Sequence, residues 1–145
     1  MKKSKNFEFL EHTGDAYIAA YGRDLAEAFE NAALAMFETM TETADVEPKI
    51  EDIVEVEGHD KESLLHNWLE DLLLRFEIRG KLYSKFHVEK IEEERGGYRL
   101  RARIYGEEFE PRKHKQKVGI KAITYHRMEI RESQQGATAK FILDI

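Results

Sequence analysis

The first residues that could carry chemistry lie in a short turn near the start of the chain. Residues 7–22, FEFLEHTGDAYIAAYG, form two apolar, strand-like runs separated by His12, Thr13, Gly14 and Asp15. A hairpin turn needs at most Gly14 and Asp15 for its backbone geometry. Two interpretations therefore stay open: His12 and Asp15 bond to nearby backbone as turn residues, or Asp15 belongs to a site completed by another carboxylate.

The last residues supply candidates for that second carboxylate. The segment KFILDI ends in Asp144 and Ile145, and four apolar residues in six predict a buried strand. A charge at such a position must be paired or bound to a cation. Clustered carboxylates repel one another, and a hard cation such as Ca²⁺, Mg²⁺ or Mn²⁺ would relieve that repulsion through oxygen ligands. Lys121 is the alternative partner for these charges.

A third group of candidates is cationic. Residues 111–126, PRKHKQKVGIKAITYH, are either a solvated loop that enters a strand or a patch for RNA phosphates or an acidic protein surface. Tyr125 is the one aromatic ring in this segment, which gives little support for base stacking. The candidate side chains are Arg112, Lys113, His114, Lys115, Lys117 and Lys121.

Motifs of autonomous enzymes do not stand out in the sequence. The six histidines form no His-x-x-x-His pair, no Ser-His-Asp arrangement can be argued, and no Gly-rich phosphate loop is present. The absence of cysteine excludes disulfides, thiolate zinc sites and cysteine nucleophiles. We therefore predict a protein that is not itself an enzyme and whose metal ligands are oxygen or imidazole.

Composition narrows the class of protein further. The 145 residues suit one domain, 1–145, and 41% hydrophobic with 36% charged residues indicate a core with a solvated exterior. A formal charge of −6 disfavours sequence-independent nucleic-acid binding. No apolar run reaches the ~20 residues that span a bilayer, and the start lacks a secretory signal. We expect a cytoplasmic protein without a membrane partner.

Hydrophobic periodicity predicts an α+β fold. Residues 23–40 have apolar residues at helical spacing, with Asp24 as N-cap and Glu27 at the capping-box position, and residues 60–80 repeat the pattern up to Gly80. After residue 82 the pattern changes to two β-hairpins, with turns at 95–97 and 133–136. The predicted order is β-β-α-β-α-β-β-β-β, with both helices covering one face of a single, largely antiparallel sheet.

Four segments of this sequence resemble segments of the archease family and occur in the same order as in that family. Together they extend over essentially the whole chain. They are residues 12–48 from HTGDAYI to DVEP, LLHNWLEDLLLRF at 64–76, GEEFEPRKHKQKVGIKAITYH at 106–126, and the closing FILDI. The most specific elements are the opening His-Thr-x-Asp, Lys-Ala-Ile-Thr-Tyr and the terminal Leu-Asp-Ile. Gly14 and Ala16 depart from the usual family motif, which loosens the turn but keeps the His and the Asp.

This resemblance implies an accessory protein of the RtcB-type tRNA-splicing ligase, a GTP-dependent and metal-dependent RNA ligase. Proteins of this kind promote guanylylation and multiple turnover of the ligase without being ligases themselves. The resemblance also implies a divalent cation, calcium first and Mg²⁺ or Mn²⁺ as alternatives, held by Asp15, Asp144 and Ile145. It extends functional roles, less specifically, to His12, Glu47 and Lys121.

Three alternatives remain beside this expectation. A small metal-dependent phosphohydrolase would use Asp15 with Asp144, although the sequence offers no second acid-base pair or nucleophile. The family also has an older description as chaperone-like modulators of nucleic-acid-processing enzymes, and an RNA-binding module would use residues 112–117. In the ligase interpretation, RNA is contacted only through the ligase or weakly. The cation is then either passed to the ligase's nucleotide site or clamps the last strand to the first turn.

Overall fold

The two helices owe their limits to capping residues that the sequence displays. In the computed structural model, which describes residues 5–11 and 14–145, α1 spans Leu25–Met40 and α2 spans Lys61–Arg79. Asp24 caps α1 by accepting the Glu27 N–H at 2.9 Å. Gly80 ends α2 in the left-handed conformation, with φ of +65°. Both predicted helices are confirmed.

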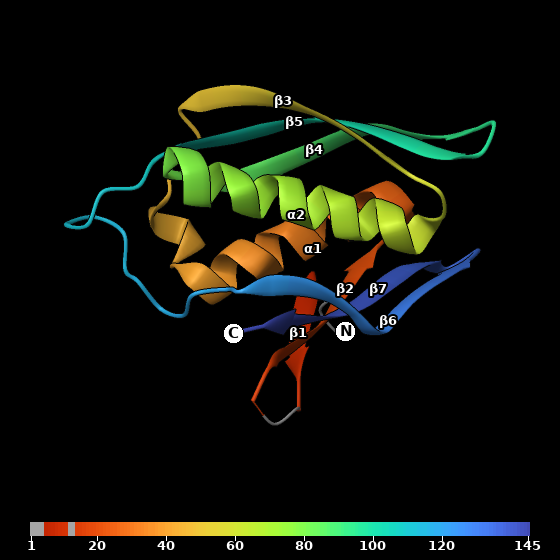
Figure 1. Cartoon of the computed structure of the whole chain (residues 1–145), viewed down its shortest axis with the longest axis horizontal. Coiled ribbons are helices and arrows are strands. Elements are labelled where there is room, and N and C mark those ends of the chain that lie inside the picture. Colours follow the sequence, from red (N-terminus) through yellow and green to blue (C-terminus); the bar gives the residue numbers. More distant parts are fainter. Residues whose placement is uncertain (1–4, 12–13) are drawn as a thin grey trace.

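The strands form two antiparallel sheets, with the helices between them (Figure 1). In the four-stranded sheet the order is β1-β2-β7-β6, and in the three-stranded sheet it is β3-β5-β4. Their bounds are β1 Phe7–Leu10, β2 Ala16–Gly22, β3 Ile50–Gly58, β4 Lys81–Glu94, β5 Gly97–Glu108, β6 Ala122–Ser133 and β7 Gly136–Asp144. A short 3₁₀ helix, Thr43–Asp45, follows α1.

The α+β class and the order of elements are confirmed, whereas the single sheet is replaced by two. Helix α1 contacts β4 of one sheet and β2 and β7 of the other, and α2 likewise contacts β3 and β6. The physical reason is that α1 is apolar on more than one side. Besides the stripe that includes Phe29 and Met36, it buries Ala28, Ala33 and Ala35, which are small enough for a second sheet to approach.

One hydrophobic core joins both sheets to both helices. Trp68 of α2 is fully buried, and its indole N–H donates to the Phe29 carbonyl of α1 at 2.9 Å. Phe86 of the three-stranded sheet packs edge-on against Trp68, and Phe141 of β7 closes the other side of the core. None of the helices among the described residues is long and apolar enough to cross a membrane.

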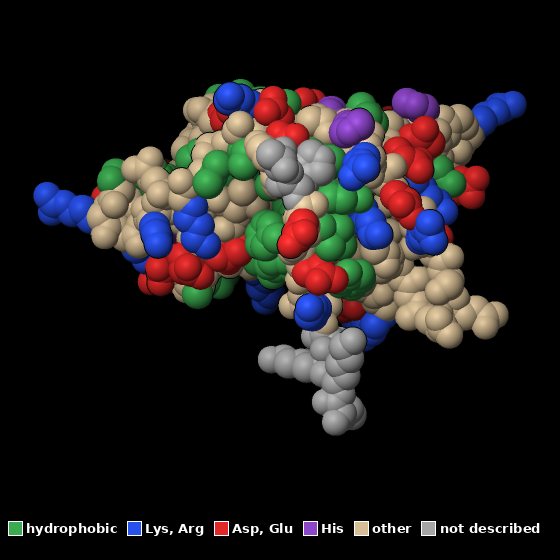
Figure 2. Space-filling model, turned by 90° about the horizontal axis from the view of Figure 1, so that it is seen from below, with side chains coloured by type: hydrophobic (Ala, Val, Ile, Leu, Met, Phe, Trp, Pro, Cys, Tyr) green, Lys and Arg blue, Asp and Glu red, His purple; other side chains and the backbone are tan. Residues whose placement is uncertain are grey.

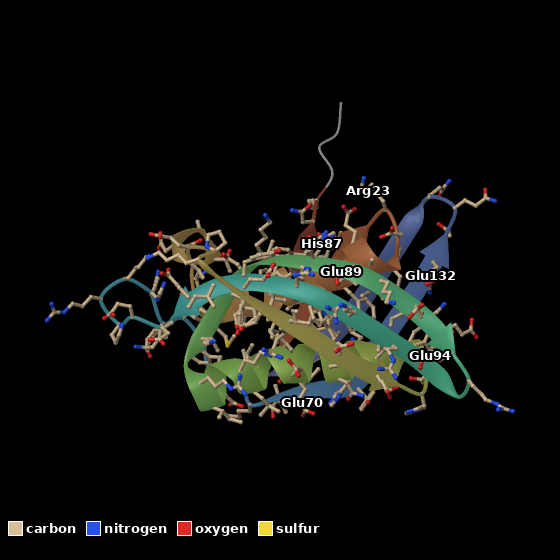
Figure 3. All side chains as sticks on the ribbon, turned by 90° about the horizontal axis from the view of Figure 1, so that it is seen from above. Arg23, Glu70, His87, Glu89, Glu94 and Glu132 are labelled. Carbon is tan, nitrogen blue, oxygen red and sulfur yellow. The ribbon has the colours of Figure 1, made fainter. Side chains whose placement is uncertain are left out.

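The outer face of the three-stranded sheet is covered by charge. The central strand β5 carries Arg99, Arg101 and Arg103, and each guanidinium pairs with glutamates on both neighbouring strands, including Glu89 and Glu94 (Figure 3). Exposed pairs of this kind each contribute about 0–1 kcal/mol. This face is therefore solvated, and its arginines are neutralised by the glutamates of the neighbouring strands.

A matched pair of glycine substitutions tests the close contact between β4 and β5. A Cβ at Gly106 would lie 1.8 Å from the Leu82 carbonyl oxygen, whereas a Cβ at Gly119 meets nothing within 4 Å. We expect Gly106→Ala to lower the free energy of unfolding by about 1–3 kcal/mol or more and Gly119→Ala to change it by less than about 0.5 kcal/mol. Urea unfolding followed by circular dichroism measures both, and equal stabilities would contradict the strand packing.

Candidate functional site

The pairing of β7 with β2 ends directly beside the two predicted aspartates. Ala16 of β2 is opposite Leu143 of β7, and Asp15 and Asp144 are the neighbours in sequence of these two paired residues. Leu143 is fully buried in the core, and Ala16 packs against that core. Because successive side chains of a strand alternate between faces, Asp144 belongs to the face that points away from the helices. Asp15 lies in the bend directly before β2.

Two carboxylates at neighbouring strand ends place like charges near each other, and a charged partner or a cation can offset their repulsion. Both aspartates are half-buried, so water screens them only in part. Figure 2, seen from the side of this sheet, shows acidic side chains among hydrophobic ones near the middle of the face. A hard divalent cation with oxygen ligands fits this donor set.

Lys121 holds the end of β7 through its main chain. Lys121 donates its backbone N–H to the Asp144 carbonyl at 2.6 Å, and Ala122 pairs with Asp144 in the sheet. The exposed ammonium of Lys121 forms no ion pair with Asp144 or Ile145, all three being among the described residues. Lys121 therefore positions the strand end and is not the counter-ion of its carboxylate.

His12 lies outside the described residues. Within 5–11 and 14–145, no three His, Cys, Asp or Glu side chains converge in a way that could hold a metal ion. The candidate centre thus consists of two aspartates and the main-chain oxygens of Ile145, with water needed for the remaining positions of a calcium ion.

Glu47 belongs to a second cluster. Its exposed carboxylate accepts from Lys113 at 2.9 Å and pairs with Lys49 at 3.3 Å. The hydrogen bond from Lys113, with a further one from Lys49, lowers the pKa of Glu47. No contact joins these three residues to Asp144 in the part of the chain that the structure describes. Among the described residues, the Glu47 carboxylate is therefore engaged by Lys113 and Lys49.

The centre of this second cluster is Glu107, which the sequence analysis missed. Its nearly buried carboxylate accepts from the Glu47 N–H at 2.8 Å, from Lys113, and from His114 Nε2 at 2.9 Å. Burial alone would raise the pKa of Glu107, but these hydrogen bonds and the charge of Lys113 lower it to about 2. Glu107 therefore ties the segment before β3 to the segment after β5.

His114 was grouped with the basic segment, yet it is 1% exposed. The Glu110 N–H donates to its Nδ1 at 2.9 Å, so that nitrogen carries no proton and Nε2 donates to Glu107. A signal was present in the sequence: the acidic run GEEFE stands directly before the cations that neutralise it.

The basic segment is largely committed to contacts within the protein. Lys113 pairs with Glu47 and Glu107, Lys117 pairs with Glu38 at 2.7 Å, and His114 is buried. Lys117 also donates its backbone N–H to the Met40 carbonyl at 2.9 Å. These contacts fix the segment to the body of the protein and leave fewer cations for RNA phosphates than the sequence suggested.

The pKa of Glu107 predicts a pH dependence of stability. Its value in the folded protein, about 2, lies below the ordinary 4.5, so its contribution is complete above pH 4.5 and is lost as the pH falls toward 2. We expect Glu107→Gln to lower the free energy of unfolding at pH 7 by about 2–3 kcal/mol, and the difference from the native protein to shrink between pH 4.5 and 2.

Glu108→Gln is the matched control because Glu108 is exposed and adjacent. Urea titrations at several pH values compare the three proteins. A Glu107→Gln variant as stable as Glu108→Gln at pH 7 would contradict the role assigned to the Glu107 carboxylate.

The sequence matches known proteins over almost its whole length. Residues 7–145 match the model of the Archease protein family. Protein archease of Sulfurisphaera tokodaii is 45% identical over 141 residues, covering 97% of this chain and 99% of the relative. Protein archease of Pyrococcus furiosus is 45% identical over 142 residues, with the same two coverages.

Solved structures agree with this match. The solution structure of Methanobacterium thermoautotrophicum protein 1598 is 43% identical, has a TM-score of 0.82, and covers 97% of this chain and 99% of its own. The crystal structure of a Thermotoga maritima archease, described as a possible chaperone, is 20% identical in sequence and has a TM-score of 0.59. The match covers 100% of this chain and 98% of the Thermotoga maritima chain, and it shows that the two share a fold. The family match and the relatives over nearly the whole length lead to one conclusion: this chain belongs to the archease family.

Proposed function

We propose that this protein activates an RtcB-type, GTP-dependent tRNA-splicing RNA ligase, and that it does so with a divalent cation held by Asp15, Asp144 and Ile145. The observation that supports the proposal is the register of β2 and β7, whose last pair, Ala16 and Leu143, stands directly beside Asp15 and Asp144 in the sequence. Family membership supports an accessory role.

The residues of this chain would act by position and charge. Asp15 and Asp144 would bind the cation, Ile145 would add main-chain oxygens, and the Lys121 N–H holds the strand end that carries them. When bound, the cation supplies charge neutralisation and alignment for the oxygens of a nucleotide triphosphate. The ligase carries out the guanylylation and the joining of RNA, and calcium is the first candidate ion, with Mg²⁺ or Mn²⁺ as alternatives.

Two other functions have weaker support. The description of the Thermotoga maritima protein as a possible chaperone favours a chaperone-like modulator of nucleic-acid-processing enzymes. An RNA-binding module would need residues 112–117, of which Lys113, His114 and Lys117 are already engaged within the protein. The ligase proposal therefore keeps RNA contact indirect or weak.

Calcium-dependent stability provides a first test of the site. Because Asp144→Asn removes a charged oxygen ligand of the cation, we expect it to change the stability of the calcium-free protein much less than that of the calcium-loaded protein. Calcium at 100 times its dissociation constant should stabilise the native protein by about 2.7 kcal/mol and the variant by almost nothing. Differential scanning calorimetry with and without calcium measures both effects.

Asp45→Asn removes the same charge from the exposed 3₁₀ helix and is the control; it should retain the calcium response. A native protein that gains no stability from Ca²⁺, Mg²⁺ or Mn²⁺ would contradict the metal site. An ion that raises stability only slightly, exchanges quickly and still changes ligase activity would favour delivery over a structural clamp.

The activating role itself is tested by RNA ligation. We expect substoichiometric native protein to increase multiple-turnover ligation of broken tRNA halves by a purified RtcB-type ligase with GTP, and Asp144→Asn to lose at least about 90% of that stimulation. Asp45→Asn should stimulate like the native protein. No stimulation by folded native protein would overturn the proposed function.

A further inference from the structure

An exposed aromatic stack stands apart from the aspartate pair and from the Glu107 cluster. Tyr125 of β6 lies flat against His66 of α2, with ring centroids 4.6 Å apart and an interplanar angle of 8°. Although His66 covers one face of the ring, Tyr125 remains 52% exposed. Tyr125 therefore presents an aromatic surface to solvent that is backed by a second ring.

The backbone of β6 is distorted where it presents this ring. Thr124 pairs with Ile142 and Glu129 pairs with Lys140, so residues 125–128 face the single residue Phe141. Within this bulge Arg127 has φ of +57°, a conformation that costs a non-glycine residue of order 1–3 kcal/mol. Bulges commonly redirect a side chain, and strained residues that persist often serve a function.

The surroundings of Tyr125 are acidic. Glu62, His66 and Glu70 succeed one another at intervals of four residues along α2, which makes one helix face, and α2 contacts β6 (Figure 3 labels Glu70). Partial burial, followed by the charges of Asp60 and Glu70, raises the pKa of Tyr125. Neither Glu62 nor Glu70 forms an ion pair with any described residue.

An exposed aromatic ring beside carboxylates favours the binding of a planar cation. A guanidinium group stacks on aromatic faces and pairs with carboxylates, and the attraction strengthens where the ring lies beside negative charge. A nucleotide would bring phosphate toward Asp60 and Glu70, which disfavours base stacking at the same ring. Arg127 lies two residues from Tyr125 in sequence but makes no cation–π contact with it among the described side chains. No cation of the described residues therefore occupies the exposed face of the Tyr125 ring.

We infer that Tyr125 and Glu70, with His66 behind the ring, form a docking site for an arginine side chain of a partner protein. The choice of the RtcB-type ligase as the partner rests on the proposed function. In that case activation and binding of the ligase would depend on two different sites of this protein. The aspartate pair would activate the ligase, and the Tyr125 site would contribute to holding it.

Binding of a free arginine analogue tests the site without the ligase. We expect N-acetylargininamide, titrated at millimolar concentration, to produce saturable NMR shifts in the ring resonances of Tyr125 and His66 and in the amide of Glu70. N-acetyllysinamide should bind several-fold more weakly. Tyr125→Leu and Glu70→Gln should each weaken arginine binding at least about threefold, whereas Tyr125→Phe and Glu77→Gln, farther along α2, should retain it. Equal shifts with both analogues, or shifts unaffected by Tyr125→Leu in a folded variant, would overturn the inference.

Titration of the ligase then tests the partner. We expect the protein concentration needed for half-maximal ligase stimulation to rise about fivefold to tenfold for Tyr125→Leu and for Glu70→Gln, and to stay within about twofold for Tyr125→Phe and Glu77→Gln. Unchanged half-maximal concentrations in both variants would overturn the assignment of this site to the ligase. If the native protein gives no stimulation, the proposed function fails, and the arginine titration alone decides the existence of the site.

Discussion

The antiparallel pairing of β7 is the constraint on which the candidate site depends. β7 lies between β2 and β6, so the end of the chain is held on one side by the strand that follows the first turn and on the other by the strand that begins at Ala122. Figure 1 accordingly places the C-terminus close to the β1–β2 hairpin. A shift of this register by one residue would move the Asp144 side chain to the opposite face of the sheet and so remove it from the candidate site.

The remaining parts of the fold hold that strand end in position. The core formed by α1, α2 and both sheets fixes β2 and β7, and the segment that leads into β6 is secured in turn by His114, Lys117 and the Lys121 N–H. Glu107 is central to this second support because its low pKa keeps it charged between Lys113 and His114. The strand end that carries Asp144 therefore depends on the core and on a support held by hydrogen bonds and ion pairs.

Much of the fold could be predicted from local sequence signals, whereas the relations between distant elements could not. Helix limits at Asp24, Asp60 and Gly80 and the two late hairpins depend on residues close in the chain, and the prediction succeeded there. The second sheet could not be predicted, because the small residues Ala28 and Ala33 of α1 do not indicate which element packs against them. The grouping of Asp15 with Asp144 follows from resemblance and charge and stays a prediction, which the register of their neighbours Ala16 and Leu143 supports. The burial of His114 depends on Glu107 and on a turn that no periodicity reveals.

The central claim is that Asp15 and Asp144 bind a divalent cation. The most direct measurement is an anomalous difference map from crystals of the native protein soaked in Mn²⁺, with calcium-soaked crystals for comparison. The account predicts a peak between the carboxylates of Asp15 and Asp144, within about 2.0–2.6 Å of their oxygens and close to the main chain of Ile145. A fully occupied peak elsewhere, or none in crystals whose Asp15 and Asp144 are free of lattice contacts, would contradict it.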